Sequence, residues 1–341
     1  MSCLPYFIVS FYLYSTLLAS IVSLDLNTEE ESNTTRFDSI DQEILDILRG
    51  DTITKLEHDE RGQCIFVKSD EGVYSYTSPG NITEVCGLYV IAQPDQTVTF
   101  EFENFSVDCT DNGLISVING WELNGQFFPA ITDHPVPRDE RYQEYCGDKK
   151  PNKKFEMSQN VGLIEFQVPR EGDGFKIIVK FQNNPEPCNA ILRDPQGVYT
   201  IKNFGRKTNC SVSIMFPESF QIISTDIGVR TKEGDSDPIA NNNTVETGLM
   251  RECKTSGVSD YVEIIGGDGL DTDIMNVAGE FCGLEFLPGK IQIDIACGNT
   301  AVRMVSSGRY ENSITIAFDL ITQFSTSNLI CPTFRDFQSI E

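Results

Sequence analysis

The sequence lacks the residues and motifs on which most enzyme active sites depend. Its 341 residues include only two histidines, His58 and His134, and no two cysteines have the CxxC spacing of zinc and redox sites. A GxSxG nucleophile elbow, an HExxH zinc motif and a phosphate-binding loop are also missing. Paired carboxylates for glycoside chemistry stay open as an alternative, because 51 acidic residues make coincidental pairs easy. We therefore expect a protein that is not an enzyme and that uses no metal and no cofactor.

Positive charge is scarce as well. The 26 lysines and arginines stand against 51 acidic residues, which gives a formal charge of −25. Such a field repels nucleic acid and anionic membranes and favours basic partners. The alternative is that the net charge only keeps the protein in solution.

Long hydrophobic runs are limited to one, from Phe7 to Val22. The acidic stretch that follows it favours a signal peptide over residues 1–23, with an uncleaved membrane anchor as the alternative. No later segment reaches the roughly 20 apolar residues that a membrane helix needs. The interpretation is a secreted, extracellular protein without membrane insertion.

Residues 24–60 form a polar leader with one predicted helix. Ser39 is a candidate N-cap with Gln42 three residues later, and Gly50 ends the pattern. This helix packs on the following domain or covers a ligand groove. Its apolar stripe consists of Ile40, Ile44, Leu45, Ile47 and Leu48.

Cysteines and sequons both predict an extracellular protein. Ten cysteines remain once Cys3 is removed with the signal peptide, and an even number in a secreted chain predicts disulfides. They are Cys64, Cys86, Cys109, Cys146, Cys188, Cys210, Cys253, Cys282, Cys297 and Cys331. The predicted glycosylation sites are Asn33, Asn81, Asn104, Asn209 and Asn242, each of which begins an N-x-S/T sequon.

From Cys64 onward, apolar and polar residues alternate with a period of two. Val98, Phe100 and Phe102, for example, alternate with threonine and glutamate. Turn-rich spacers such as NNPEP (183–187) separate these stripes. The pattern predicts an all-β fold in which half-buried antiparallel strands form sandwiches.

Two sequence features occur twice along the chain. Cys64 and Cys86 are 22 residues apart, as are Cys188 and Cys210, and the block E-[YF]-C-G follows in each half. Two copies of one domain are therefore predicted. The predicted boundaries are 61–185 for the first domain, 186–334 for the second and 335–341 for a tail.

The duplication also narrows the disulfide pairing, because the same pairs should recur in each copy. One pair is then left to tie the tail. The predicted disulfides are Cys64–Cys86, Cys109–Cys146, Cys188–Cys210, Cys253–Cys282 and Cys297–Cys331.

The second copy resembles the CUB domain, a jelly-roll-like β-sandwich of extracellular proteins, and the first copy does so less closely. The resemblance rests on two cysteines near the start, the strand DYVEI (260–264) and the FCG after it. Many CUB domains bind calcium through acidic residues that include the Asp of this strand. Asp260 matches it, but the first copy has no carboxylate at the equivalent place, and no calcium site is carried over. The expected fold is two tandem CUB-like jelly-roll β-sandwiches, stapled by disulfides, with a short N-terminal helix.

The segment DHPVPRDERY (133–142) concentrates ionisable groups around His134. Pro135 and Pro137 hold it extended, and the other histidine, His58, lies in the leader. A catalytic histidine needs a nucleophile or metal and an orienting group, which the segment does not supply. A structural loop between strands is therefore favoured over a catalytic one.

Three further features have open roles. Arg303 interrupts the apolar strand AVRMV and is expected to pair with a carboxylate such as Asp294, or to line a groove. Trp121 is either a partly exposed anchor or a core aromatic. The polar insertion at 232–250 is expected to be the first site of proteolytic cleavage.

Seven blocks occur in an order that identifies a family. They are NGWELNGQFFP (119–129), DHPVPRDERY (133–142), SQNVGLIEF (158–166), GDGFKI (172–177), NCSVSI (209–214), DYVEIIGGDGLD (260–271) and CGNTAVRMVSSGRYENSITIAF (297–318). With the ten cysteines, this set resembles the corticotropin-releasing factor-binding protein family. The resemblance implies a secreted protein that sequesters helical peptide hormones of the corticotropin-releasing factor, urocortin or arthropod diuretic-hormone type and limits their receptor signalling. The alternative is a CUB-type extracellular protein-interaction module, calcium-dependent in the second domain.

The resemblance also suggests where the peptide binds. Ligand contacts in the family are associated with the segment around the first cysteine, with a basic residue before it and an acid two places after it. Here Arg61 precedes Cys64, and Phe66 takes the place of the acid. Arg61 and Phe66 are the candidate ligand-binding residues, with solvated surface and a core strand position as the respective alternatives. The identity of the peptide, the location of its groove and the oligomeric state are left open.

Overall fold

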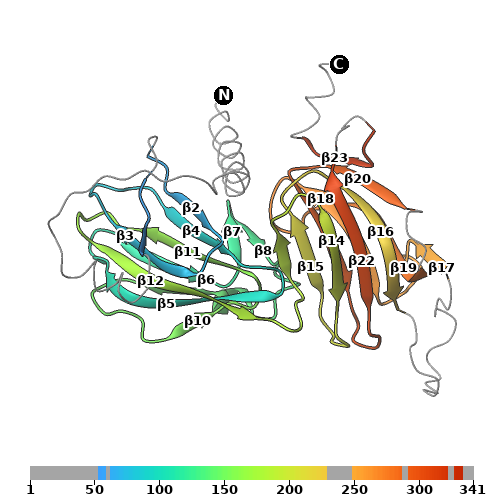
Figure 1. Cartoon of the computed structure of the whole chain (residues 1–341), viewed down its shortest axis with the longest axis horizontal. Coiled ribbons are helices and arrows are strands. Elements are labelled where there is room, and N and C mark those ends of the chain that lie inside the picture. The colour runs from blue at the N-terminus through green and yellow to red at the C-terminus, as the bar shows by residue number, and fades with distance from the viewer. Residues whose placement is uncertain (1–52, 59–61, 229–247, 286–290, 322–325, 333–341) are drawn as a thin grey trace, which may run out of the picture.

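The computed structural model describes residues 53–58, 62–228, 248–285, 291–321 and 326–332. Two β-sandwiches lie side by side along the long axis of the molecule (Figure 1). No helix within the described ranges is long and apolar enough to cross a membrane. The predictions that lie outside these ranges are the signal peptide, the leader helix, Arg61, Asn33, Asn242, most of the 232–250 insertion and the 335–341 tail.

The first sandwich consists of two five-stranded sheets. The β1 sheet has the order β1 (Ile53–Lys55), β3 (Gly72–Thr77), β12 (Gly174–Asn183), β5 (Gln96–Ser106) and β10 (Lys154–Glu156). The β2 sheet has the order β2 (Ile65–Lys68), β4 (Cys86–Ile91), β11 (Val161–Gln167), β6 (Leu114–Ile118) and β9 (Tyr142–Tyr145). Between β6 and β9 the chain forms the hairpin β7 (Trp121–Leu123) and β8 (Gln126–Phe128) and the short helix α3 (Arg138–Arg141).

The second sandwich has the same jelly-roll-like plan. One layer has the order β13 (Ala190–Leu192), β15 (Cys210–Ile214), β21 (Asn299–Val305), β18 (Tyr261–Gly267), β19 (Asn276–Glu285) and β17 (Gly248–Arg251). The other has the order β14 (Gly197–Lys202), β22 (Ser313–Leu320), β16 (Glu218–Ile227), β20 (Gln292–Ala296) and β23 (Leu329–Ile330). The end of β16 also pairs with β19, so the two layers are joined into one sheet.

Period-two alternation explains these strands. Val98, Phe100 and Phe102 on β5 are at most 1% exposed, because they point between the two sheets. Glu101 and Glu103 lie on the opposite face, where Lys154 and Lys176 form ion pairs with them. The predicted all-β, CUB-like fold is confirmed.

The strand order confirms the duplication. In each copy the first core strand runs parallel to its neighbour, β2 to β4 and β13 to β15. In each copy a register shift also interrupts one long ladder, β12 with β5 and β22 with β16. Both halves therefore repeat one strand plan, as the cysteine spacing predicts.

The five disulfides join the pairs that the repeat predicts. Cys64–Cys86 and Cys188–Cys210 connect the same two strands in the two copies. Cys109–Cys146 and Cys253–Cys282 are the second equivalent pair. Cys297–Cys331 belongs to the second copy alone and holds the segment of β23 to the end of β20.

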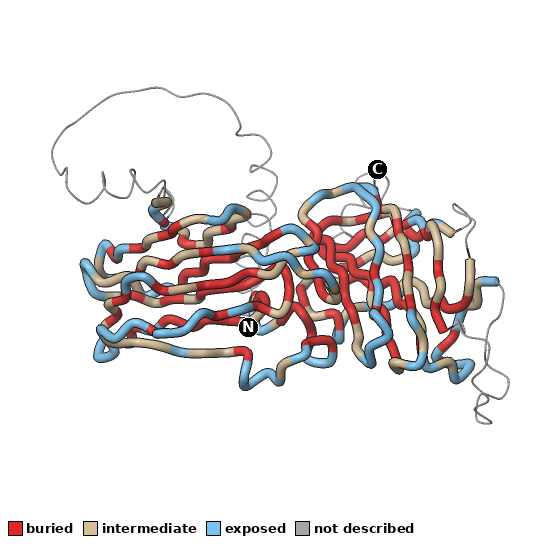
Figure 2. Tube along the Cα trace, turned by 60° about the horizontal axis from the view of Figure 1, so that its bottom comes forward, coloured by how far each residue is buried: buried red, intermediate tan, exposed pale blue. Residues whose placement is uncertain are grey.

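An apolar core runs through the junction between the sandwiches. The outer face of the β2 sheet carries Tyr89, Ile91 and Leu163, and these residues belong to the same buried cluster as the core of the second sandwich. Trp121 is fully buried in this cluster, where its indole N–H donates to the carbonyl oxygens of Val90 and Gly162. Figure 2 shows buried positions in both sandwiches and at the junction. Trp121 is thus a core aromatic. The two copies pack directly against each other.

One carboxyl group is buried within the second sandwich. Glu218, at the start of β16, is 0% exposed, and neither of its side-chain oxygens has a hydrogen-bond partner among the described residues. It points to the same side of the strand as Phe220 and Ile222. Burial, with a smaller effect of Asp319, raises the pKa of Glu218 to about 8. The carboxyl is therefore protonated at neutral pH.

Glu218 makes the stability of the protein depend on pH. Between pH 4.5 and 8 the unfolded chain loses this proton while the native protein keeps it, so the free energy of unfolding falls as the pH rises. We expect Glu218→Gln to remove this loss and to gain about 3.5 kcal/mol at pH 8 relative to pH 5. Urea unfolding at the two pH values measures the difference, and Glu103→Gln on the surface is the control. Parallel pH profiles of wild type and Glu218→Gln would contradict this assignment.

Candidate functional site

The segment around the first cysteine lies on the open edge of the β2 sheet. Phe66, on β2, is half-buried and stacks on Phe166 with ring centroids 6.4 Å apart. Nearby, the Nε2 atom of His58 lies 3.0 Å from the hydroxyl of Tyr76. Phe66 therefore occupies a strand position against the core, with part of its ring left accessible. Arg61 lies outside the described residues.

A potential metal-binding cluster at this edge does not fit a metal. His58, Cys64 and Cys86 bring their side-chain ligand atoms within 4.8 Å of one another. The two sulfur atoms, however, form a disulfide with each other and offer no thiolate. The cluster is a structural contact.

The charged segment 133–142 lies at the junction between the sandwiches. Its Asp133 is 2% exposed, and the carboxylate accepts hydrogen bonds from three residues of the second sandwich. These donors are the guanidinium of Arg303, at 2.6 and 3.0 Å, and the hydroxyls of Ser211 and Thr272. The segment therefore connects the two domains through buried hydrogen bonds.

Arg303 has other partners than the sequence suggests. The expected pairing with Asp294 is wrong: Arg303 pairs with Asp133 and also lies 3.2 Å from Asp273 and 3.8 Å from Glu263. Asp294 instead accepts from the side chain of Gln292. Burial alone would lower the pKa of Arg303, but the hydrogen bonds and charge of Asp133 outweigh it and raise the pKa. The cation is therefore held firmly charged between the two domains.

His134 has the chemistry of a neutral core residue. Burial, with a smaller effect of Arg141, lowers the pKa of His134 to about 4. Its Nδ1 atom lies 2.9 Å from the backbone of Val136, and its Nε2 atom has no hydrogen-bond partner among the described residues. Arg141 is also buried and donates to the backbone carbonyls of Asn119, Phe128 and Pro129. These contacts fix the loop around the imidazole.

A second group of buried hydrogen bonds crosses the same junction. The side chain of Asn160, 0% exposed, donates to the carbonyl oxygen of Ile191 at 2.8 Å and accepts from its N–H at 2.9 Å. Asn189 donates to the carbonyl of Asp133 and accepts from the N–H of Ser211. These buried side-chain amides thus form hydrogen bonds with backbone groups at the start of the second domain, in the place that a neighbouring strand would otherwise take.

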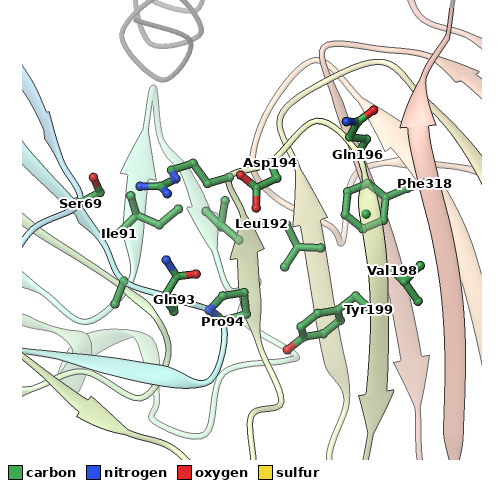
Figure 3. A pocket seen from close by; sticks show the side chains of 14 residues that line it. Ser69, Ile91, Gln93, Pro94, Leu192, Asp194, Gln196, Val198, Tyr199 and Phe318 are labelled. Carbon is green, nitrogen blue, oxygen red and sulfur yellow. The ribbon is translucent and has the colours of Figure 1, made fainter. Parts of the chain in front are cut away.

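A hollow of about 160 Å³ opens beside this junction (Figure 3). One wall comes from the end of β4 and the following loop, with Ile91 and Pro94. The other comes from β13, β14 and β22, with Leu192, Tyr199 and Phe318. The lining combines these apolar side chains with polar groups, among them Gln93, Arg193 and Asp194, and suits a ligand group that is partly apolar.

A pair of carboxyl groups lies on the outer side of the β2 sheet. Burial, together with a hydrogen bond and the charge of Glu122, raises the pKa of Glu165 well above its usual range. Tyr89 lies between this pair and the junction and donates its hydroxyl to the carbonyl of Glu122. Glu165 therefore holds its proton near neutral pH, which weakens the repulsion between the two side chains.

The oxygens of Asp260 are saturated by donors. The carboxylate is 0% exposed and accepts from the N–H of Ser307, the amide of Asn312 and the hydroxyls of Ser259 and Ser306. A calcium ion needs free oxygens, whereas these neighbours present hydrogens to the carboxylate. The residues around Asp260 therefore do not fit calcium.

Three of the predicted sequons lie on described residues. Asn81 and Asn104 are exposed. Asn209 is half-buried at the junction, where its side-chain nitrogen lies 3.4 Å from the carbonyl oxygen of Thr132. A glycan on Asn209 would therefore project beside the contact between the domains.

Replacing Arg303 tests the junction. Arg303→Leu leaves Asp133 buried without its cation, which should lower the free energy of unfolding by about 3 kcal/mol. Denaturant unfolding measures this, with Arg170→Leu as control, since Arg170 forms an exposed ion pair with Asp108 that contributes little to stability. Equal losses in the two variants would mean that Arg303 does not hold the junction.

Both halves of the chain match models of one family. Residues 58–183 match the corticotropin-releasing factor binding protein N-terminal domain, and residues 190–326 match its C-terminal domain. The corticotropin-releasing factor-binding protein of sheep (Ovis aries) is 31% identical over 269 residues, which cover 78% of this chain and 77% of the relative. The mouse (Mus musculus) protein is 32% identical over 272 residues, 79% of this chain and 80% of the relative.

Similarity to solved structures is looser. The CUB1-EGF-CUB2 domains of rat MASP-1 are 10% identical and match 75% of this chain and 99% of that chain, with a TM-score of 0.27. That score is too low to compare how the domains are arranged. The match of both family models, in order and across most of the chain, is decisive: the chain belongs to the corticotropin-releasing factor-binding protein family.

Proposed function

We propose that the protein is secreted and sequesters peptide hormones of the corticotropin-releasing factor, urocortin or diuretic-hormone type, and so limits their receptor signalling. The observation that carries the proposal is the match of both halves to the binding-protein family. The relatives are named for binding corticotropin-releasing factor. Five disulfides suit an oxidising extracellular environment and support secretion from the predicted signal peptide at 1–23.

The junction supports binding by a preformed surface. Asp133, Arg303 and Asn160 fix the two domains in one orientation through buried hydrogen bonds. A ligand that contacts both domains then need not order them, which lowers the entropic cost of binding. The proposed mode is an amphipathic helix laid on this surface, with apolar anchors supplying affinity and the acidic protein attracting basic stretches of the peptide.

The proposed contacts from the sequence remain Arg61 and Phe66. Phe66 is half-buried and follows Cys64 of the Cys64–Cys86 disulfide by two residues, and its accessible part suits an apolar contact. The proposed domains span 61–185 and 186–334, after a leader at 24–60. The proposed protein is a glycoprotein without catalytic activity, which agrees with a family named for binding.

The second candidate is a CUB-type module that recognises a protein surface. The donor-rich surroundings of Asp260 speak against the calcium-dependent form of this function. Unchanged melting temperature in calcium and in chelator agrees with the hormone-binding function, whereas a calcium-dependent shift would favour the module.

Calorimetric titration tests the proposed function. The secreted, glycosylated protein is titrated with a synthetic corticotropin-releasing factor peptide and with a scrambled peptide of the same composition. We expect one-to-one binding of the native order alone, because apolar anchors at helical spacing are lost on scrambling. Equal binding of both peptides would mean that the acidic protein only attracts their charge, without reading their sequence. Binding of neither peptide would contradict the proposal.

A further inference from the structure

The two copies differ at one strand edge. The strand β3 reads GVYSYT and its counterpart β14 reads GVYTIK. In the first copy β3 lies between β12 and the short parallel strand β1. Among the described residues, β14 pairs with β22 on one side only. The second copy thus has an open edge where the first copy has a third strand.

Two equivalent valines differ in their exposure because only one of the two edges is covered. Val73 on β3 lies opposite Ile53 of β1 and is 5% exposed. Val198, the equivalent residue on β14, is 66% exposed. An exposed β-branched residue on an unpaired edge strand is a surface to which another strand can add. The Gly-Val-Tyr segment that the two strands share is therefore covered in the first copy and exposed in the second.

The backbone of the open edge of β14 has an N–H and a carbonyl group that an added strand could pair with. In the first copy the N–H of Leu56, just after β1, donates to the carbonyl oxygen of Ser75 at 2.8 Å. The repeat places Thr200 at the position of Ser75. The N–H and carbonyl of one strand residue point to the same side, so those of Thr200 point to the open edge. An added strand would pair with them.

The surroundings of β14 indicate the chemistry of the added segment. The hollow at the junction begins beside Val198 and is lined by Pro94, Leu192 and Phe318 (Figure 3). Asp194 lies at its rim, and the charge of Asp95 is close enough to Tyr199 to add to the effect of burial, which raises the pKa of Tyr199 to about 12. Arg193 also lines the hollow, but neither aspartate forms an ion pair with it or with another described residue. The site therefore suits an apolar side chain with a cation nearby.

We propose that the open edge of β14 binds an extended segment of the peptide ligand, parallel to β14, with an apolar residue over Val198 and a cation facing Asp95 and Asp194. The strand β1, with the sequence Ile-Thr-Lys, is the internal template for such a segment. This inference rests on the proposed function and adds strand addition to helix binding. It assigns the ligand to both domains, because the hollow is shared between them.

Two variants of Thr200 test the edge. Thr200→Pro removes the edge-facing N–H, whereas Thr200→Val keeps it, and both remove the side-chain contact with Thr315. The probe is synthetic corticotropin-releasing factor peptide, titrated calorimetrically into the secreted protein. We expect Thr200→Pro to raise the Kd about tenfold relative to Thr200→Val, since an edge strand loses its pairing register. Hydrogen exchange should show that the peptide protects the Thr200 amide in the wild type.

A side-chain variant keeps the test open if Thr200→Pro fails to fold. Val198→Lys changes a residue that is 66% exposed, and Val277→Lys, at a residue 53% exposed on β19, is the matched control. We expect Val198→Lys to weaken binding of the peptide about tenfold and Val277→Lys to leave it unchanged.

The outcomes separate this inference from the proposed function. Tight binding by the wild type that is equal in all variants, without protection of the Thr200 amide, would overturn strand addition and leave the hormone-binding function intact. No binding by the wild type would overturn both. A dimer of the peptide-free protein that Thr200→Pro dissociates would assign the edge to a second copy of the chain and overturn the proposal.

Discussion

The buried contact between Asp133 and Arg303 is the interaction on which the shape of this protein depends. Each partner comes from a different domain, and each is almost removed from water. A buried charge without its partner is costly, so the two domains cannot separate without exposing or orphaning both groups. The apolar cluster around Tyr89 and Ile191 provides the area of the junction, and the ion pair together with the Asn160 contacts fixes its orientation. The fixed orientation of the two described sandwiches follows from a few buried polar groups.

Folding changes how many of the acidic side chains contribute negative charge at the surface. Glu218 and Glu165 hold protons near neutral pH because burial opposes their ionisation. Asp133 and Glu263 are offset by the guanidinium of Arg303. The charge that a partner meets is therefore carried by the exposed acids, such as Asp194 beside the hollow, and its distribution matters more than its sum.

Much of the fold could be predicted from the sequence, since its determinants are local or repeated. Alternation over Val98 to Phe102 predicts a strand, and equal cysteine spacings in the two halves predict the disulfides. The partner of Arg303 could not be predicted, because it lies 170 residues away and only the packing of the domains brings it close. Asp294 was an equally reasonable choice from composition alone. The open edge of β14 was equally out of reach, since the motif GVYTIK is the same kind of strand whether or not a neighbour covers it.

The position of Trp121 has a spectroscopic consequence. It is the only tryptophan of the chain, it is fully buried at the junction, and its ring lies 5.4 Å from that of Tyr89. Opening of the junction would bring water to the indole while the strands of both sandwiches stay formed. The emission of the wild-type protein thus reports on the contact between the domains, and together with far-UV circular dichroism, which follows the strands, it distinguishes separation of the domains from unfolding.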